Sequence, residues 1–151
     1  MSTAFVRAAT DSLAPSPPRR VVRPGVLPSS SPKDWVQACP LGTLLPGRGV
    51  AVLLPDDAQA AVFLLPNGML YAVDNLDPYS GAAVLSRGLT GDREGEPTVA
   101  SPLLKQRFSL RTGEALDDPS VRLTTYAVRV LTGTVFLGIE QQQARAASHA
   151  A

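Results

Sequence analysis

Two segments organise this chain, Val73-Asp-Asn-Leu-Asp-Pro-Tyr-Ser-Gly81 and Ala100-Ser-Pro-Leu-Leu-Lys-Gln-Arg-Phe-Ser-Leu-Arg-Thr-Gly113. Each begins at the end of a predicted strand and passes into a turn that contains proline. Proline has no amide hydrogen and a fixed φ angle, so it interrupts strand pairing. Both segments therefore predict loops that leave the end of a β-sheet.

Short apolar runs surround these segments, and turn-forming residues separate the runs. Pro55-Asp-Asp57 lies between two runs and Pro66-Asn-Gly68 between the next two, as expected for hairpins. Runs of this length with frequent turns are typical of an all-β sandwich or barrel. The predicted strands cover residues 35–39, 50–54, 60–65, 69–73, 98–100, 107–110, 126–131 and 134–139.

Aromatic residues in the predicted strands are the candidates for the core. We expect Trp35 to anchor the first strand and Cys39 to pack beside it as a small apolar residue. The other aromatic residues assigned to the core, with no cofactor role, are Phe63, Tyr71, Phe108, Tyr126 and Phe136.

The composition of the 151-residue chain indicates one domain. With 14 basic and 13 acidic residues, the net charge of +1 favours neither nucleic acid nor a membrane surface as a partner. No run of about 18 apolar residues exists, and no secretory signal is expected. We predict a disordered tail over residues 1–32, a domain over 33–140 and a second tail over 141–151.

Cysteine and histidine are too few for most metal centres. The chain has one Cys, Cys39, and one His, His149. A structural zinc site needs about four such ligands, and an iron–sulfur centre with mixed ligands needs about two of each. A single Cys also excludes an internal disulfide, which fits a cytoplasmic location. We interpret His149, in the predicted C-terminal tail, as an exposed residue.

Acidic residues form two groups that suggest acid–base or metal chemistry. Asp74 and Asp77 follow a strand, where Asp commonly builds a turn by accepting a backbone hydrogen bond. Asp92, Glu94 and Glu96 lack the spacing of a calcium-binding loop. We therefore interpret the first pair as turn residues and the second group as a solvated hairpin tip.

Both organising segments resemble the cluster-binding loops of Rieske [2Fe–2S] domains. In that family the first loop follows a strand ending in Ala, a hydrophobic residue, Asp and Asn, and then contains Cys-Pro-His. Here the strand ends at Asn75, and Asp77 and Tyr79 stand at the Cys and His positions. The second loop of the family contains Cys-Pro-x-His, and here Ser101 and Leu104 stand at the ligand positions.

The residues at these positions cannot supply the ligands of a Rieske centre. An iron–sulfur cluster needs thiolates, with imidazole on one iron in the Rieske type. Asp77, Tyr79 and Ser101 offer only oxygen, and Leu104 has no donor atom. We therefore predict an all-β, Rieske-like sandwich with the loops retained and the ligands lost. Tyr79, Leu103 and Leu104 are expected to fill the space of the cluster, and no catalytic, cofactor or metal residue is assigned.

A narrower resemblance is to the small subunits of assimilatory NAD(P)H-dependent nitrite reductases. It rests on Asp-Asn-x-Asp-Pro-x-Ser at 74–80, Ser-Arg-Gly at 86–88 and Ser-Pro-x-x-Lys-Gln-Arg-Phe at 101–108, and it spans about residues 34–139. The resemblance implies a role in the six-electron reduction of nitrite to ammonium. It also implies a large partner subunit that carries FAD, an iron–sulfur cluster and sirohaem, and no cofactor in this chain.

Polar and basic residues beside the loops are the candidates for contact with that partner. They are Ser86, Arg87, Lys105, Gln106 and Arg107, and an ordinary surface role stays open for each. Two other functions also stay open. One is a free-standing Rieske-like module that binds another protein, and the other, against the count of Cys and His, is a Rieske-type ferredoxin.

Overall fold

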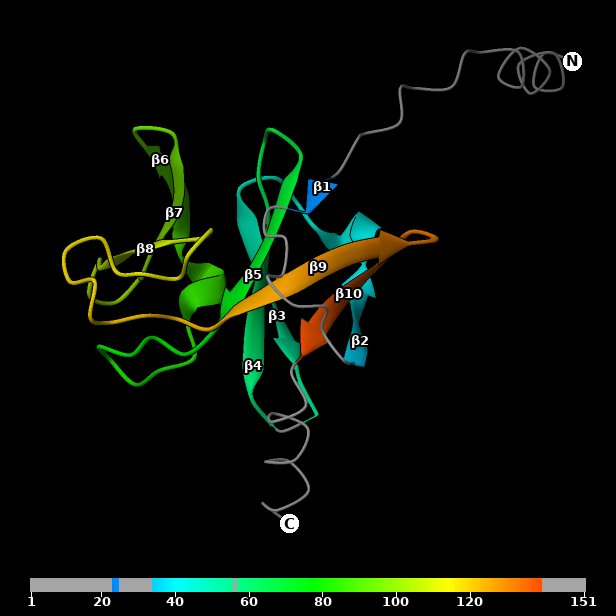
Figure 1. Ribbon diagram of the computed structural model, residues 1–151, viewed down its shortest axis with the longest axis horizontal. Helices are drawn as coiled ribbons and strands as arrows, with labels where there is room; N and C mark the ends of the chain where they lie inside the picture. The colour runs from blue at the N-terminus through cyan, green and yellow to red at the C-terminus, as the bar shows by residue number, and fades with distance from the viewer. Residues whose placement is uncertain (1–22, 25–33, 56, 140–151) are drawn as a thin grey trace, which may run out of the picture.

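The strands of the described residues form one large and one small sheet, with antiparallel pairing except where β1 (Arg23–Pro24) joins the large sheet in parallel (Figure 1). The computed structural model describes residues 23–24, 34–55 and 57–139. The large sheet has the order β2-β10-β9-β5-β4-β3, and the small sheet has the order β6-β7-β8. The predicted all-β fold is confirmed, and helix is limited to two 3-10 turns, η1 (Leu41–Thr43) and η2 (Leu85–Arg87), within the described chain.

The large sheet contains most of the predicted strands. All its pairings along that order are antiparallel. Its strands are β2 (Asp34–Pro40), β3 (Arg48–Leu53), β4 (Gln59–Leu64), β5 (Met69–Asp74), β9 (Thr125–Leu131) and β10 (Thr134–Ile139).

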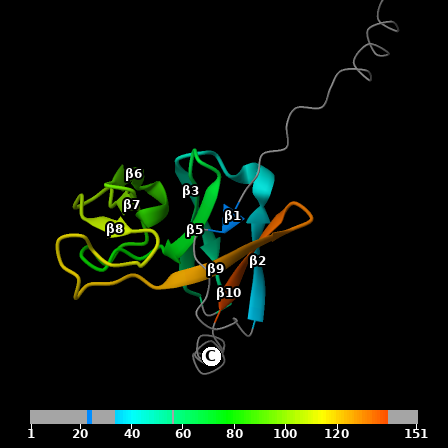
Figure 2. The same cartoon turned by 45° about the horizontal axis from the view of Figure 1, so that its top comes forward.

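Strands β4 and β5 are buried on both faces, and this divides the core into two clusters. Val62 and Leu70 face one way, into a cluster that draws on these six of the seven strands of the large sheet. Phe63 and Tyr71, each one residue further along, face the other way, toward the small sheet and the loops. Because successive side chains of a strand point to opposite faces, a nearly continuous apolar run fits a strand between two apolar layers. The sheet curls around the first cluster (Figure 2).

The small sheet lies beside the second cluster and carries the second loop, between β7 and β8, whereas the first loop leaves β5 of the large sheet (Figure 1). Its strands are β6 (Leu89–Arg93), β7 (Glu96–Ala100) and β8 (Arg107–Ser109). Val99 and Phe108 are opposite one another and fully buried, so this row of the sheet faces the core. No strand was predicted at residues 89–91, so β6 is a difference between the structure and the prediction from sequence.

The turn between β4 and β5 forms as its sequence predicts. The Asn67 side chain accepts a hydrogen bond from the Met69 amide at 3.0 Å. Gly68 has φ of +87°, a left-handed conformation that glycine adopts without a steric penalty. The turn fixes the register in which Leu64 is opposite Leu70.

Two aromatic residues assigned to the core lie elsewhere. Trp35 and Phe136 are only half-buried and belong to neither core cluster, so the prediction that they are core residues is wrong. The guanidinium carbon of Arg129 lies 4.2 Å from the centre of the Trp35 ring and 5.8 Å from that of Phe136. This cation–π stack lies on the opposite face of the sheet from the buried Val135 and Leu137. Cys39, Phe63, Tyr71, Phe108 and Tyr126 are buried as predicted.

A two-residue strand lies inside the segment predicted as the N-terminal tail. Strand β1 (Arg23–Pro24) pairs in parallel with Met69 and Leu70 of β5, so at these two residues the structure departs from the predicted disorder. Residues 1–22, 25–33 and 140–151 lie outside the described residues, and so does His149. The two predicted tails and the domain limits between them therefore stay predictions.

Candidate functional site

The first loop, residues 75–84, follows β5 and is shaped by hydrogen bonds to acidic side chains. Asp74 Oδ1 accepts a hydrogen bond from the Leu76 amide at 3.0 Å. Asp77 Oδ1 accepts one from the Tyr79 amide at 2.9 Å. Both contacts span two residues, the geometry of an Asx turn. The interpretation of Asp74 and Asp77 as turn residues is confirmed.

Asn75 joins the first loop to its surroundings. It is 1% exposed, and its Nδ2 donates hydrogen bonds to Gln59 Oε1 at 2.9 Å and to the Ala83 carbonyl at 3.3 Å. Its Oδ1 accepts the Ser86 amide at 2.7 Å. Because both polar atoms of this buried side-chain amide form hydrogen bonds, they hold the loop in a single conformation. The sequence analysis placed Asn75 at the strand end but gave it no role.

The second loop, residues 101–106, is a short closed turn between β7 and β8. The Ser101 amide donates to the Gln106 carbonyl at 2.8 Å, and the Lys105 amide donates to the Ser101 carbonyl at 3.1 Å. Lys105 adopts φ of +64°, which is uncommon for a residue other than glycine. The loop therefore holds its tip, Pro102 to Lys105, away from the sheet.

One hydrogen bond joins the two loops directly. Ser101 Oγ donates to Asp77 Oδ2 at 2.6 Å, and Ser80 Oγ donates to the same oxygen at 3.0 Å. Asp77 and Ser101 have no exposed surface, so water does not compete for this contact. These are the residues predicted to stand at the two Cys positions, one in each loop.

The ionised form of Asp77 is favoured by its neighbours. Burial raises the pKa of a carboxyl group, but here the hydrogen bonds from Ser101, Tyr79 and Ser80 outweigh it and lower the pKa of Asp77 below its ordinary value. Hydrogen bonds to an ionised acceptor are also stronger than those between neutral groups. The junction between the loops is thus a buried carboxylate held by hydroxyl and amide donors.

Tyr79 and Leu104, at the two predicted His positions, differ in environment. Tyr79 packs against the second core cluster, with its ring centre 6.0 Å from that of Phe108. Leu103 and Leu104 are 53% and 52% exposed. The expectation that these two leucines fill the space between the loops is therefore wrong, because Asp77 and Ser101 occupy the junction.

The residues predicted to bind a partner are only partly on the surface. Arg87, Lys105 and Arg107 are exposed, and Gln106 is half-buried. Ser86 is 9% exposed within η2, so its side chain offers little surface to a partner. Strand pairing places Leu89 opposite Ala100 and Ala100 opposite Arg107, so the two basic segments reach the same end of the small sheet.

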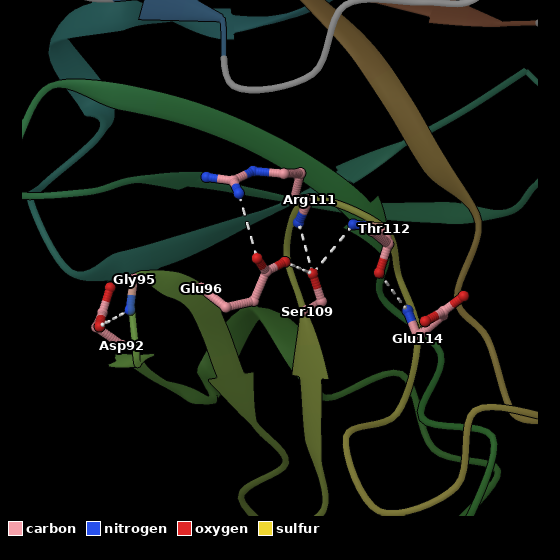
Figure 3. A network of polar contacts seen from close by, with 7 residues as sticks. All are labelled: Asp92, Gly95, Glu96, Ser109, Arg111, Thr112 and Glu114. Carbon is pink, nitrogen blue, oxygen red and sulfur yellow. Dashed lines mark hydrogen bonds and ion pairs between the residues drawn. The ribbon is translucent and has the colours of Figure 1, made fainter.

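A second polar network lies at the other end of the small sheet (Figure 3). Ser109 Oγ donates to the Glu96 carboxylate and accepts the amides of Arg111 and Thr112, each at 3.1 Å. The Arg111 guanidinium forms an ion pair with Glu96 at 3.2 Å. Asp92 Oδ1 accepts the Gly95 amide at 2.8 Å. The interpretation as a solvated hairpin tip agrees with the exposed Asp92 and Glu94, but it is wrong for Glu96, which is half-buried in β7 because Ser109 and Arg111 bind its carboxylate.

No cluster of potential metal ligands occurs among the described residues. They contain no group of three or more His, Cys, Asp or Glu arranged to hold a metal ion. Cys39 packs within the first core cluster, where burial raises the pKa of its thiol. In the same residues, no helix is long and apolar enough to cross a bilayer.

The sequence and the fold match known proteins. A family model described as Rieske-like [2Fe-2S] domain matches residues 34–138. The nitrite reductase (NADH) small subunit of Escherichia coli is 39% identical over 104 residues, which cover 69% of this chain and 96% of that protein. A solved structure from Mycobacterium tuberculosis, assigned as an NADH-dependent nitrite reductase small subunit, is 50% identical, with a TM-score of 0.67 and coverage of 70% of this chain and 95% of that one.

A much larger relative contains a similar region. A nitrite reductase [NAD(P)H] large subunit from Klebsiella oxytoca is 40% identical over 119 residues. The match covers 79% of this chain but only 12% of that protein. In that relative, a region similar to this chain is therefore part of the large polypeptide itself.

Proposed function

This chain belongs to the Rieske-like family of nitrite reductase small subunits, and we propose that it is the small subunit of an NAD(P)H-dependent nitrite reductase. In this proposal it assembles with a large subunit that reduces nitrite to ammonium by transfer of six electrons. The redox groups, FAD, an iron–sulfur cluster and sirohaem, belong to the large subunit. We include in this proposal that the chain and its large subunit are located in the cytoplasm.

The observation that carries the proposal is the match to one part of a large subunit. In the Klebsiella oxytoca protein, a region similar to this chain is covalently joined to the remainder of the large subunit. Joining two domains in one chain keeps them together at high effective concentration. We infer that this separate chain takes the corresponding place by non-covalent association.

We propose further that the chain holds no [2Fe–2S] cluster, since the residues at the ligand positions do not fit one. The Asp77 carboxylate already accepts hydrogen bonds from Tyr79, Ser80 and Ser101. Leu104 has no donor atom, and the whole chain contains one Cys and one His. Since a Rieske cluster takes thiolate and imidazole ligands, this set of hard oxygen donors is unsuited to it.

With no redox group of its own, the chain contributes through structure. The Ser101–Asp77 hydrogen bond joins the loops from β5 and β7, where the family resemblance places the cluster. It supplies a connection between the loops that does not depend on iron. We propose that the chain stabilises the large subunit and takes no direct part in the chemical steps.

The experiment that tests the assembly is co-purification from the native host. A tagged chain is expected to bring down a large sirohaem protein, and deletion of its gene is expected to lower NAD(P)H-dependent nitrite reduction. A chain that never associates, and whose loss leaves that activity intact, contradicts the proposal. In that event the free-standing interaction module becomes the better interpretation.

The exposed cations beside the loops give a first prediction. Arg87→Glu or Lys105→Glu is expected to weaken binding to the purified large subunit by about tenfold, since a reversed charge at a complementary interface is unfavourable. Both side chains are exposed, so the folded state is expected to keep its stability. Calorimetric titration measures the affinity, and Leu53→Glu, at the exposed last residue of β3, is the control. Equal affinities for all three variants would rule out docking through these residues.

A further inference from the structure

The outer face of the small sheet is covered at Thr98 and Ser109, but at the end nearest the second loop it is open in the described chain. Leu89, Ala100 and Arg107 form one row across β6, β7 and β8. The next row contains Val99 and Phe108, which are fully buried. Because successive residues of a strand alternate between faces, the row of Leu89, Ala100 and Arg107 points away from the core. We call this surface the outer face.

A shallow groove of about 280 Å³ runs along the outer face. It is lined by residues of all three strands of the small sheet, namely Leu89, Thr90, Gly91, Asp92, Thr98, Ala100 and Arg107. Leu89 is 74% exposed, more than any other large apolar side chain of the described residues. Burial of this side chain by a partner at the groove would remove apolar surface from water and favour binding.

Strand β6 adds a second binding feature, because it is the edge of the small sheet (Figure 1). It pairs with β7 on one side only. On the other side, Thr90 Oγ1 donates to the Gly47 carbonyl at 3.1 Å, and among the described residues no further strand pairs there. An edge with free amide and carbonyl groups can accept an additional strand from another chain.

The charge of the outer face indicates the chemistry of its partner. Arg111 and Arg122 each form an ion pair, with Glu96 and Glu114 respectively. Arg87 and Arg107 are exposed and form no ion pair within the described chain. The single acidic residue that lines the groove is Asp92, near the C-terminal end of β6. Its Oδ1 accepts a hydrogen bond from the Gly95 amide. The end near Arg87 and Arg107 is therefore complementary to a carboxylate.

We infer that the outer face binds an extended segment of the large subunit, which adds to the edge of β6. The segment carries an apolar side chain that packs on Leu89 and an acidic side chain that pairs with Arg107. This inference rests on the proposed function, because the large subunit is its partner. It extends that function by placing the interface on the small sheet rather than at the loop tips alone.

Two substitutions test the inference in the complex with the complete large subunit. Leu89→Glu and Arg107→Glu are each expected to lower the affinity by about tenfold or more, measured by calorimetry. Leu53→Glu, on β3 with its side chain 65% exposed, is the matched control, with a change below about twofold. Thermal unfolding of each isolated variant checks that the fold is intact.

Hydrogen exchange gives a second measurement that does not depend on substitution. The amides of residues 89–93 are expected to become protected when the large subunit is added, and those of β3 to stay unchanged. Protection confined to the loop tips, or affinity losses equal to that of the control, would overturn the inference while the proposed function stands. A wild-type chain that does not bind at all would instead overturn the proposed function.

Sedimentation of the isolated chain tests whether a second copy of this chain, instead of the large subunit, covers the outer face. A monomer at all concentrations agrees with the inference. A dimer that Leu89→Glu converts to a monomer would show that a second copy of this chain covers the outer face, and would overturn the assignment to the large subunit.

Discussion

In the large sheet the fully buried side chains are apolar, such as Val62, Leu70 and Leu137, whereas at the loops they include Asp77 and Ser101. The sheet is stabilised by removal of apolar surface from water, which needs no exact partner geometry. The loops are held by hydrogen bonds between particular atoms, led by Ser101 Oγ to Asp77 Oδ2. The comparison indicates that the sheet supplies the stability and the polar junction fixes how the loops are placed.

The largest expected effect belongs to the sheet. Leu137→Ala is expected to lower the free energy of unfolding by about 2–5 kcal/mol, because it removes a fully buried side chain and leaves a cavity. Denaturant unfolding followed by tryptophan fluorescence measures it, since Trp35 is the only tryptophan. If Leu137→Ala lowered the free energy of unfolding by less than Asp77→Ala, the sheet would not be the main source of stability.

The polar junction is expected to show the second largest effect. Asp77→Ala leaves the buried Ser101 hydroxyl without its acceptor and is expected to cost about 1–3 kcal/mol. Asp92→Ala is the matched control, since Asp92 also accepts a turn amide but is exposed. Denaturant titration of both variants is expected to give a clearly smaller loss for Asp92→Ala. Equal losses would mean that burial adds nothing to the junction.

The pH dependence of stability tests whether Asp77 is ionised at the junction between the loops. Because the pKa of Asp77 is lowered in the folded state, its carboxylate stabilises the protein above the unfolded pKa of about 3.9. That stabilisation is lost as the pH falls through the folded pKa. The difference in stability between wild type and Asp77→Ala is therefore expected to be full at neutral pH and to shrink below about pH 4. A difference that stays constant down to low pH contradicts the ionised junction.

The smallest effect is expected at the tip of the second loop. Leu104→Ser is expected to change the unfolding free energy by less than about 0.5 kcal/mol, since more than half of Leu104 is exposed. Thermal unfolding measures the change, and Leu110→Ser, at a fully buried leucine, is the comparison variant, for which we expect a much larger loss of stability. A large loss for Leu104→Ser would mean that this leucine does fill the space between the loops.

Much of the large sheet could be predicted from the sequence, because runs such as residues 60–65 are apolar on both faces. Strand β6 could not, since Leu89 is its only apolar residue and the strand is held by pairing with β7. Trp35 and Phe136 were misplaced because Arg129 stacks on both from the surface, and hydrophobicity alone does not show which face a partner occupies.

The loops could be located from the sequence, but their internal contacts could not. Asp77 and Ser101 are separated by 24 positions, and nothing in local propensity brings their oxygens to 2.6 Å. The role of Asn75 likewise depends on Gln59 in the neighbouring strand. The residue types at the predicted ligand positions led us to expect that the ligands of a [2Fe–2S] cluster are missing. Only the structure shows that the Ser101–Asp77 hydrogen bond joins the two loops there.

The most direct test of this account is the iron content of the purified chain, separated from the co-expressed large subunit. We expect no iron above background and no visible absorption, because the Ser101–Asp77 hydrogen bond joins the loops without a cluster. About two iron atoms per chain, with the absorption of a [2Fe–2S] cluster, would contradict it.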